Sequence, residues 1–282
     1  MDMHATEPAT ATTLADLIGW QVQREQHRPL LTVYDDVTGG RTELSYATAD
    51  NWASKTANLL AEEFDLASAA SLALDVDGHW TTAVLVLACW KLGAAVHVSA
   101  AAPASALVCR HESRIGGETP GPTLIVGDGL RAEPTGDVPT GEHVVLLGED
   151  VHAFADDYDD PAVDAATPAL VTPSTTLDQA AMVADAAQWR AILGDGARVG
   201  LAARLDRTEA LGLFAGVIAA SGSIVVHRPP PEDLPVGRWR TERVTVVVGD
   251  AGTADPGDTT GMSDIPFVPL RSPTDGQMAT SG

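Results

Sequence analysis

Two stretches of the sequence share one pattern: TELSYATADNWASKTANLL at residues 42–60 and TTLDQAAMVADAAQWRAIL at residues 175–193. In each, threonine and a short polar segment precede apolar residues at helical spacing, and the two apolar stripes coincide at a constant offset. The stripes consist of Ala49, Ala53, Thr56 and Leu60 in the first stretch and Met182, Ala186, Trp189 and Leu193 in the second. A long-range repeat of this kind indicates duplicated architecture.

The residues that follow each stretch repeat as well. The first copy ends in ACWKLGAAVHV at residues 88–98 and the second in AGVIAASGSIVVH at residues 215–227. Each copy therefore predicts a helix, a short strand, an apolar helix and a Val-rich strand led by glycine. This alternation is typical of an α/β protein whose parallel strands are covered on both faces. We interpret His97 and His227 as equivalent strand-end residues with a shared structural role.

Outward from the repeats, capping and turn residues predict the remaining elements. Gly39–Gly40 suits the tight turn of a hairpin, and Ser45 is a suitable N-cap for a helix over 46–64. Further helices are expected over 14–24, 79–92 and around 103–112. Strands are expected over 71–76, 94–98, 123–126, 143–147, 169–172, 198–202, 223–227 and 245–249. The resulting organisation is a flexible lead (1–12), a first α/β lobe (13–150), an acidic linker (151–167), a second α/β lobe (168–250) and a flexible tail (251–282).

The charge balance argues against several classes of function. The formal net charge is −22, with Lys55 and Lys91 as the two lysines, and no basic cluster is available to neutralise nucleic-acid phosphates or an anionic membrane. The N-terminus lacks the pattern of a signal peptide, and the longest apolar stretch, residues 83–98, is shorter than the ~20 residues of a membrane span. We therefore expect a soluble, cytoplasmic protein.

Two motifs suggest ligands but fail in context. Gly127-x-Gly129-x-x-Ala132 follows a predicted strand as in a dinucleotide site, yet the prolines and glycines after it prevent the required helix. The acidic group Asp156, Asp157, Asp159 and Asp160 lacks the spacing of a calcium loop and is typical of a solvated linker. The sequence predicts no metal, no cofactor and no catalytic residues.

The first copy nevertheless resembles a known family. A T-x-L-S-Y entry, Asn58–Leu59, the His79–Trp80 helix start and ACWKLGAAVHVSAAAPAS are similar to the N-terminal region of the adenylate-forming superfamily, which includes acyl-CoA synthetases and AMP-binding ligases. The resemblance covers about residues 14–250 and is nearest to a short actinobacterial family of AMP-binding-like proteins with no assigned activity. It implies a large domain built from two similar lobes of mainly parallel sheet flanked by helices.

The resemblance also indicates where catalysis would occur. In active relatives a Ser/Thr/Gly loop ending in Pro-Lys-Gly wraps the ATP phosphates. The matching stretch here is ALVTPSTTLDQAA, in which Thr172, Ser174, Thr175 and Thr176 keep hydroxyls as a remnant phosphate loop. Pro173 removes an amide, Ala180 stands at the lysine position, and Asp178 adds negative charge. Asp206 stands where relatives place a histidine, and the adenine and magnesium motif and the small C-terminal domain have no match.

These departures favour a catalytically degenerate AMP-binding-like protein that serves as a binding or interaction module. Its partner would be an unidentified protein or a small acyl or nucleotide ligand. The alternative is a weakly active or partner-dependent synthetase, in which the loop hydroxyls hold an acyl-adenylate and a separate chain supplies the missing domain. A purely structural remnant is a third possibility.

Overall fold

The computed structural model describes residues 11–76, 78–98, 104–110, 122–127, 129, 131–134, 143–159, 162–230, 233–251 and 265–272. The helices are α1 (Leu14–Glu25), α2 (Tyr46–Phe64), α3 (Trp80–Leu92), α4 (Leu147–Asp150), the 3-10 turn η3 (Val151–Ala153), α5 (Gln179–Leu193), α6 (Thr208–Ala219) and α7 (Val236–Thr241). The strands are β1 (Pro29–Asp35), β2 (Gly40–Ser45), β3 (Ser71–Asp75), β4 (Ala95–His97), β5 (Ala106–Arg110), β6 (Thr123–Val126), β7 (Val144–Leu146), β8 (Pro168–Val171), β9 (Thr176–Asp178), β10 (Arg198–Ala202), β11 (Ser223–Arg228), β12 (Val246–Gly249) and β13 (Phe267–Pro269).

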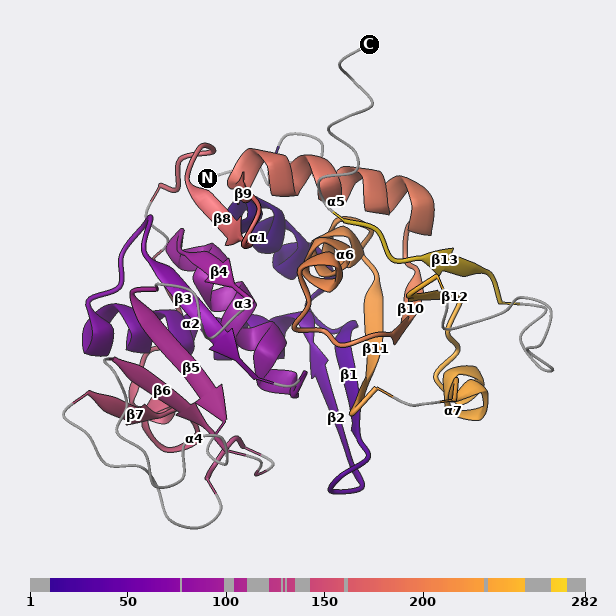
Figure 1. The fold of residues 1–282 in the computed structure, drawn as a ribbon, viewed down its shortest axis with the longest axis horizontal. Coiled ribbons are helices and arrows are strands. Elements are labelled where there is room, and N and C mark those ends of the chain that lie inside the picture. Colours follow the sequence, from indigo (N-terminus) through magenta and orange to yellow (C-terminus); the bar gives the residue numbers. More distant parts are fainter. Residues whose placement is uncertain are drawn as a thin grey trace.

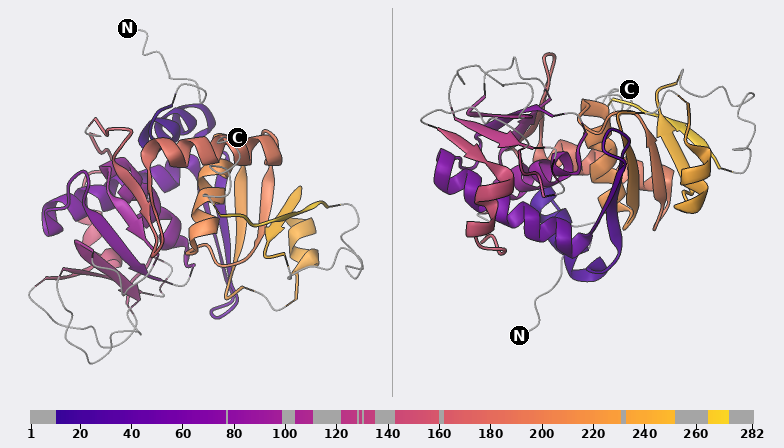
Figure 2. Two further views of the ribbon diagram at one scale, coloured as in Figure 1. Left: turned by 45° about the horizontal axis from the view of Figure 1, so that its top comes forward. Right: turned by 90° about the horizontal axis from the view of Figure 1, so that it is seen from below.

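The strands form two mainly parallel sheets that lie side by side (Figures 1 and 2). Sheet A has the order β13-β12-β10-β11-β1-β2, and sheet B has the order β7-β6-β5-β3-β4-β8-β9. The antiparallel pairs are the hairpins β1–β2 and β8–β9, each at one edge of its sheet. This confirms the α/β class and the mainly parallel arrangement expected from the repeat.

The two copies exchange their hairpins. Strand β1, from the first copy, pairs with β11 of the second, and β8, from the second copy, pairs with β4 of the first. Each sheet is therefore completed by the hairpin that precedes the other copy in sequence. The pairing divides the chain differently from the two consecutive lobes expected at 13–150 and 168–250, because residues 29–45 lie in the sheet of the later strands.

The strand register relates the two copies residue by residue. Both hairpins have an irregularity in the same place, between Pro29 and Leu31 and between Pro168 and Leu170. Leu31 faces Ile224, and Leu170 faces Val96 in the same way. His97 therefore matches Val225, and the expected equivalence of His97 with His227 is wrong by two residues.

Two apolar helices occupy the space between the sheets. Every residue of α3 is buried, and so is α6 from Ala210 to Ala219. The rings of Trp90 and Phe214 stack across the two copies with centroids 6.2 Å apart. A helix that is apolar on all sides has to lie inside the molecule. One hydrophobic core consequently runs through both copies.

Helix starts follow from side-chain caps. Ser45 accepts a hydrogen bond from the Thr48 amide at the start of α2, and Asp178 accepts one from Ala181 at the start of α5. These equivalent caps satisfy amides that have no partner within the helix. The predicted N-cap at Ser45 is confirmed, and the apolar stripes of both helices face the core as expected.

Two expected segments differ from the structure. The helix expected around 103–112 is wrong, because residues 106–110 form β5 between β3 and β6. In the tail expected to be flexible, residues 267–269 form β13 and pair with β12. A short apolar run suits a buried strand as well as a helix, so pairing with neighbouring strands decides its structure. Residues 1–10 of the expected lead lie outside the described part.

The acidic linker is held against α2. Lys55 Nζ donates to the Phe154 carbonyl at 2.7 Å, and Asn58 Nδ2 donates to the carbonyls of Ala155 and Asp157, both at 3.0 Å. Backbone carbonyls of this segment thus have side-chain partners in place of a regular ladder. The segment is irregular but anchored.

Candidate functional site

The predicted phosphate loop is the tight turn between β8 and β9. The Thr172 hydroxyl accepts from the amides of Ser174 at 3.3 Å and Thr175 at 3.0 Å, and it lies 3.1 Å from the Thr175 carbonyl, to which it donates. The Thr172 amide also donates to the Thr175 carbonyl, at 2.8 Å. Three amides of the turn therefore point at partners within the turn, and Pro173 has none to offer.

The turn brings the predicted hydroxyls together in part. Thr172 Oγ1 and Ser174 Oγ lie 3.3 Å apart, and Thr175 closes the turn through its backbone. Thr176 begins β9 with an exposed side chain, facing Val171 across the hairpin. The structure thus places Thr172, Ser174 and Thr175 in one turn that is closed by its own internal hydrogen bonds, with Thr176 beside it.

The charges near this turn do not suit a phosphate. Asp178 lies at the base of the hairpin as the cap of α5, and the exposed Ala180 occupies the position of the lysine in active relatives. The two lysines of the chain are engaged elsewhere: Lys91 Nζ lies 2.7 Å from Asp50 Oδ1, and Lys55 binds the linker.

A second candidate location is the meeting point of the loops that follow β3 and β10. Arg204 donates to the Val76 carbonyl at 3.3 Å and holds Asp206 through an Nε–Oδ1 contact of 2.9 Å. Ligands of parallel α/β sheets commonly bind outside the carboxyl ends of the strands, which is where these loops lie. Asp206 is thus committed to an arginine of its own loop.

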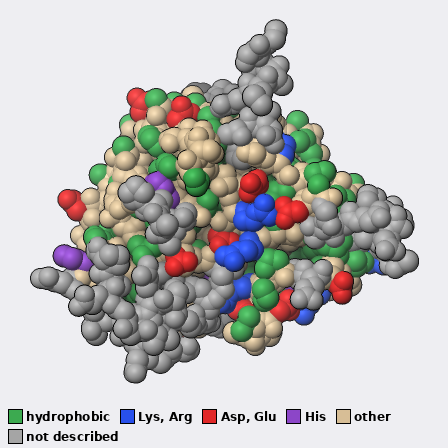
Figure 3. Space-filling view, in the orientation of Figure 1, with side chains coloured by type: hydrophobic (Ala, Val, Ile, Leu, Met, Phe, Trp, Pro, Cys, Tyr) green, Lys and Arg blue, Asp and Glu red, His purple; other side chains and the backbone are tan. Residues whose placement is uncertain are grey.

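Charges at this junction are mutually compensated. Arg207 NH1 lies 2.7 Å from Asp250 Oδ2 after β12, and Arg207 Nε lies 3.5 Å from Glu209. Figure 3 shows basic and acidic side chains side by side in the middle of this face of the molecule. Neighbouring carboxylates reduce the attraction of these arginines for an anionic ligand.

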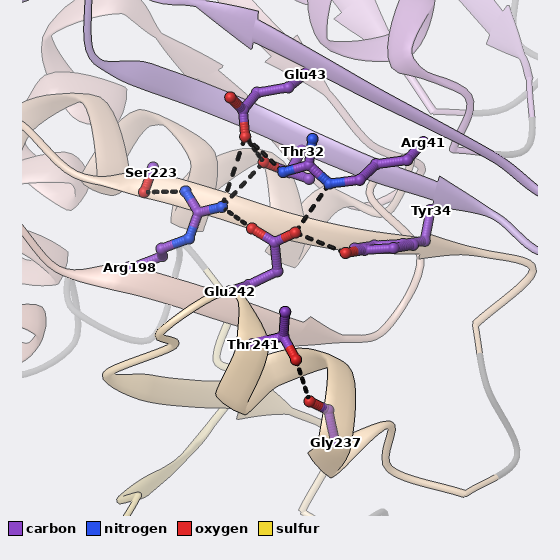
Figure 4. Close-up of polar contacts among 9 residues, drawn as sticks. All are labelled: Thr32, Tyr34, Arg41, Glu43, Arg198, Ser223, Gly237, Thr241 and Glu242. Atoms are coloured by element: carbon purple, nitrogen blue, oxygen red, sulfur yellow. Dashed lines mark hydrogen bonds and ion pairs between the residues drawn. The ribbon is translucent and has the colours of Figure 1, made fainter.

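The outer face of sheet A carries a polar network that the sequence did not reveal (Figure 4). The carboxylate of Glu242, which follows α7, accepts from Tyr34 Oη at 2.6 Å and Arg41 Nε at 2.9 Å, and it also binds Arg198. Burial of the carboxyl raises the pKa of Glu242, but the hydrogen bonds from Arg41, Tyr34 and Arg198 outweigh this and bring it down to about 2. The alternation Arg41-x-Glu43 on β2 was the one available signal.

The two rejected motifs have structural explanations. Residue Gly127 lies so close to the chain after β6 that an added Cβ would be 2.0 Å from the Glu133 carbonyl oxygen, and the described residues 129 and 131–134 form no helix. Among the acidic linker residues, Asp156 accepts from Asn51 at 3.1 Å. In the described ranges no group of three or more acidic, histidine or cysteine side chains could hold a metal ion. Nor does that part of the chain contain a helix long and apolar enough to cross a membrane.

Comparison with known proteins finds a relative by sequence and solved structures with the same fold. No family model matches the chain. Over 86 residues, which are 30% of this chain and 35% of the other, it is 40% identical to a TIGR03089 family protein of Mycobacterium tuberculosis (strain ATCC 25618 / H37Rv). The matched segment thus spans about a third of that protein.

Solved structures with the same fold include acyl-CoA ligases. An acyl-CoA synthetase of Brucella canis superposes with a TM-score of 0.72 at 13% identity, covering 86% of this chain and 48% of that one. A long-chain-fatty-acid-CoA ligase of Archaeoglobus fulgidus gives 0.67 at 12% identity, with 86% and 52% covered. The chain thus spans about half of these enzymes. It has the fold of the large N-terminal domain of the adenylate-forming ligases, as the sequence resemblance implies.

Proposed function

We propose that this protein is a binding or interaction module on an adenylate-forming scaffold that does not carry out adenylation itself. The proposal rests on one observation, the internal hydrogen bonding of the amides in the β8–β9 turn. In a phosphate-binding loop, backbone amides point outward to the anion. Here the amides of Thr172, Ser174 and Thr175 are used inside the turn.

Charge supports the same conclusion. A triphosphate requires countercharge, but the hairpin ends in Asp178, and the first turn of α5 offers the neutral Ala180. Two like charges about 4 Å apart repel by about 1 kcal/mol in water and by more near a protein surface. Lys91 cannot compensate, because it is 7% exposed and bound to Asp50 and Ser54.

The ligand of such a module would be a small acyl or nucleotide compound or a protein partner. Native mass spectrometry of the purified protein distinguishes these, because a retained small molecule adds its own mass and a partner chain co-purifies. Recovery of a separate chain that carries a catalytic lysine would favour the partner-dependent synthetase.

Acid-dependent ATP–pyrophosphate exchange tests the proposal directly. We expect no exchange above the protein-free rate for a panel of carboxylic acids, with an active acyl-CoA synthetase as the positive control. A double substitution, Pro173→Gly with Ala180→Lys, restores an amide to the turn and a cation to the first turn of α5 as a matched comparison. Exchange by the unmodified chain would overturn the proposal.

A further inference from the structure

The Glu242 carboxylate is bound by side-chain donors of sheet A in the way that a protein binds a carboxylate ligand. Its two oxygens accept from three side chains that come from three neighbouring regions of sheet A: Tyr34 on β1, Arg41 on β2 and Arg198 on β10. The Glu242 side chain is 8% exposed. Charge-assisted hydrogen bonds from guanidinium groups are the strong type, and they match the planar shape of a carboxylate.

The donors are positioned by contacts other than Glu242. Arg198 NH1 donates to Ser223 Oγ and its NH2 to Thr32 Oγ1, both at 3.1 Å. Arg41 NH2 lies 2.7 Å from Glu43. Residues fixed on paired strands and supported by their neighbours make a preorganised site. The receptor side of the contact therefore belongs to the sheet.

The occupant, in contrast, belongs to a short element. Helix α7 has six residues, and a helix of that length has little stability of its own. It is kept on the sheet by Trp239, which is fully buried in an apolar cluster and lies against Gly200, and by the side chains of Arg238 and Glu242. Glu242 itself follows the last residue of α7, and helix ends open more readily than buried positions do.

We propose that Tyr34, Arg41 and Arg198 form a binding site for a small carboxylate ion, and that Glu242 fills it as an internal occupant which such a ligand replaces when the C-terminal end of α7 opens. The site is distinct from the β8–β9 turn and does not depend on the proposed function.

The charge of the site selects a monoanion. Without Glu242, two guanidinium groups face one carboxylate, Glu43, whose Oε2 lies 3.8 Å from Arg198 NH2. One further negative charge completes the balance, whereas a phosphate dianion would exceed it and meet Glu43. Arg198 Nε is also buried with no hydrogen-bond partner, so the site has a donor that Glu242 does not use.

Chemical rescue in the full-length chain tests this proposal. Glu242→Ala empties the site, and sodium acetate should then bind in place of the lost side chain. At ten times its dissociation constant, acetate should raise the Tm of this variant by roughly 3–6 °C over the same concentration of sodium chloride. The unmodified chain should bind acetate at least tenfold more weakly, because the tethered occupant competes.

A matched control is Asp250→Ala, which removes the carboxylate partner of a half-exposed arginine, Arg207. Acetate should not rescue it. Where Glu242→Ala does not fold, Glu242→Ser, which also leaves the carboxylate position empty, gives the same comparison by titration of acetate in NMR, and adding Arg198→Gln should abolish binding. Equal effects of acetate and chloride on the Glu242 variant, or equal rescue of Asp250→Ala, would reduce the cluster to an ion-pair network and overturn the proposal.

Discussion

Leu31 in the first copy pairs with Ile224 in the second, and this contact joins the two repeats within one sheet. The reciprocal contact, Leu170 with Val96, completes the other sheet. Because the hairpin that precedes each copy pairs with the strands of the other copy, neither copy forms a complete sheet by itself. The structure therefore predicts that the two copies fold as one cooperative unit.

Truncation at either hairpin should destabilise the whole chain. Leu31 and Leu170 are both 1% exposed, so Leu31→Ala and Leu170→Ala should each lower the free energy of unfolding by about 2–5 kcal/mol. Val37→Ala, at a side chain 71% exposed, is the matched control and should change little. Urea denaturation followed by tryptophan fluorescence and far-UV circular dichroism checks this. Two separate transitions, with one insensitive to Leu31→Ala, would contradict the exchange.

Acid should destabilise the protein through His227. Burial lowers the pKa of His227 from its ordinary value of 6.5, and Asp36 counteracts this in part. The unfolded chain then binds the proton more readily, so the stabilisation is complete above pH 6.5 and is lost as the pH falls toward the folded pKa. Over that range one such group accounts for at most about 1.4 kcal/mol per pH unit.

Substitution separates His227 from other acid-sensitive groups. His227→Phe keeps a ring beside Tyr34, whose centroid lies 5.2 Å from that of the imidazole, and removes the titration. Its free energy of unfolding should depend less on pH just below 6.5 than that of the unmodified chain, whereas the exposed His27→Gln should leave the dependence intact. Identical pH profiles for His227→Phe and the unmodified chain would exclude His227 as the source. Glu242 acts in a lower window, between its ordinary 4.5 and about 2.

Helices α5 and α6 pack too closely for a side chain at Gly216. An added Cβ there would lie 2.1 Å from Trp189 Cβ, so Gly216→Ala should cost about 1–3 kcal/mol or more. Gly237 in α7 has open space around it, and Gly237→Ala should be neutral or stabilising by up to about 1 kcal/mol. Thermal unfolding of both variants measures the difference. Equal Tm values would show that the close approach has no energetic importance.

The hydroxyl of Thr172 should stabilise the folded protein. Thr172→Val removes the acceptor of two turn amides and should cost about 1 kcal/mol. Ser174→Ala, at an exposed neighbour in the same turn, should have little effect. Chemical denaturation distinguishes them. A neutral Thr172→Val would mean that this hydroxyl is free for another role.

The elements set by local chemistry could be predicted from the sequence. Ser45 caps α2, glycine forms the β1–β2 turn, and the apolar stripes of α2 and α5 face the core. These signals lie within a few residues of one another and depend little on the rest of the chain.

Features that depend on distant residues could not be predicted from the sequence. Strand β5 exists because it pairs with β3 and β6, and β13 because its backbone extends the ladder of β12 in spite of Pro269. The exchange of hairpins also has no local sequence signal. The Glu242 site unites residues from the first 45 positions with Arg198 and Glu242, and no spacing in the sequence predicts such a contact.

The β8–β9 turn should not bind ATP. Isothermal titration of the full chain with ATP–Mg²⁺, and separately with AMP, tests it most directly. We expect no saturable heat with ATP–Mg²⁺ up to millimolar concentration, whereas saturable heat with AMP alone would identify the ligand of the module as a nucleotide and would leave this expectation intact. Micromolar affinity for ATP–Mg²⁺ in the unmodified chain, lost in Thr172→Val, would contradict it.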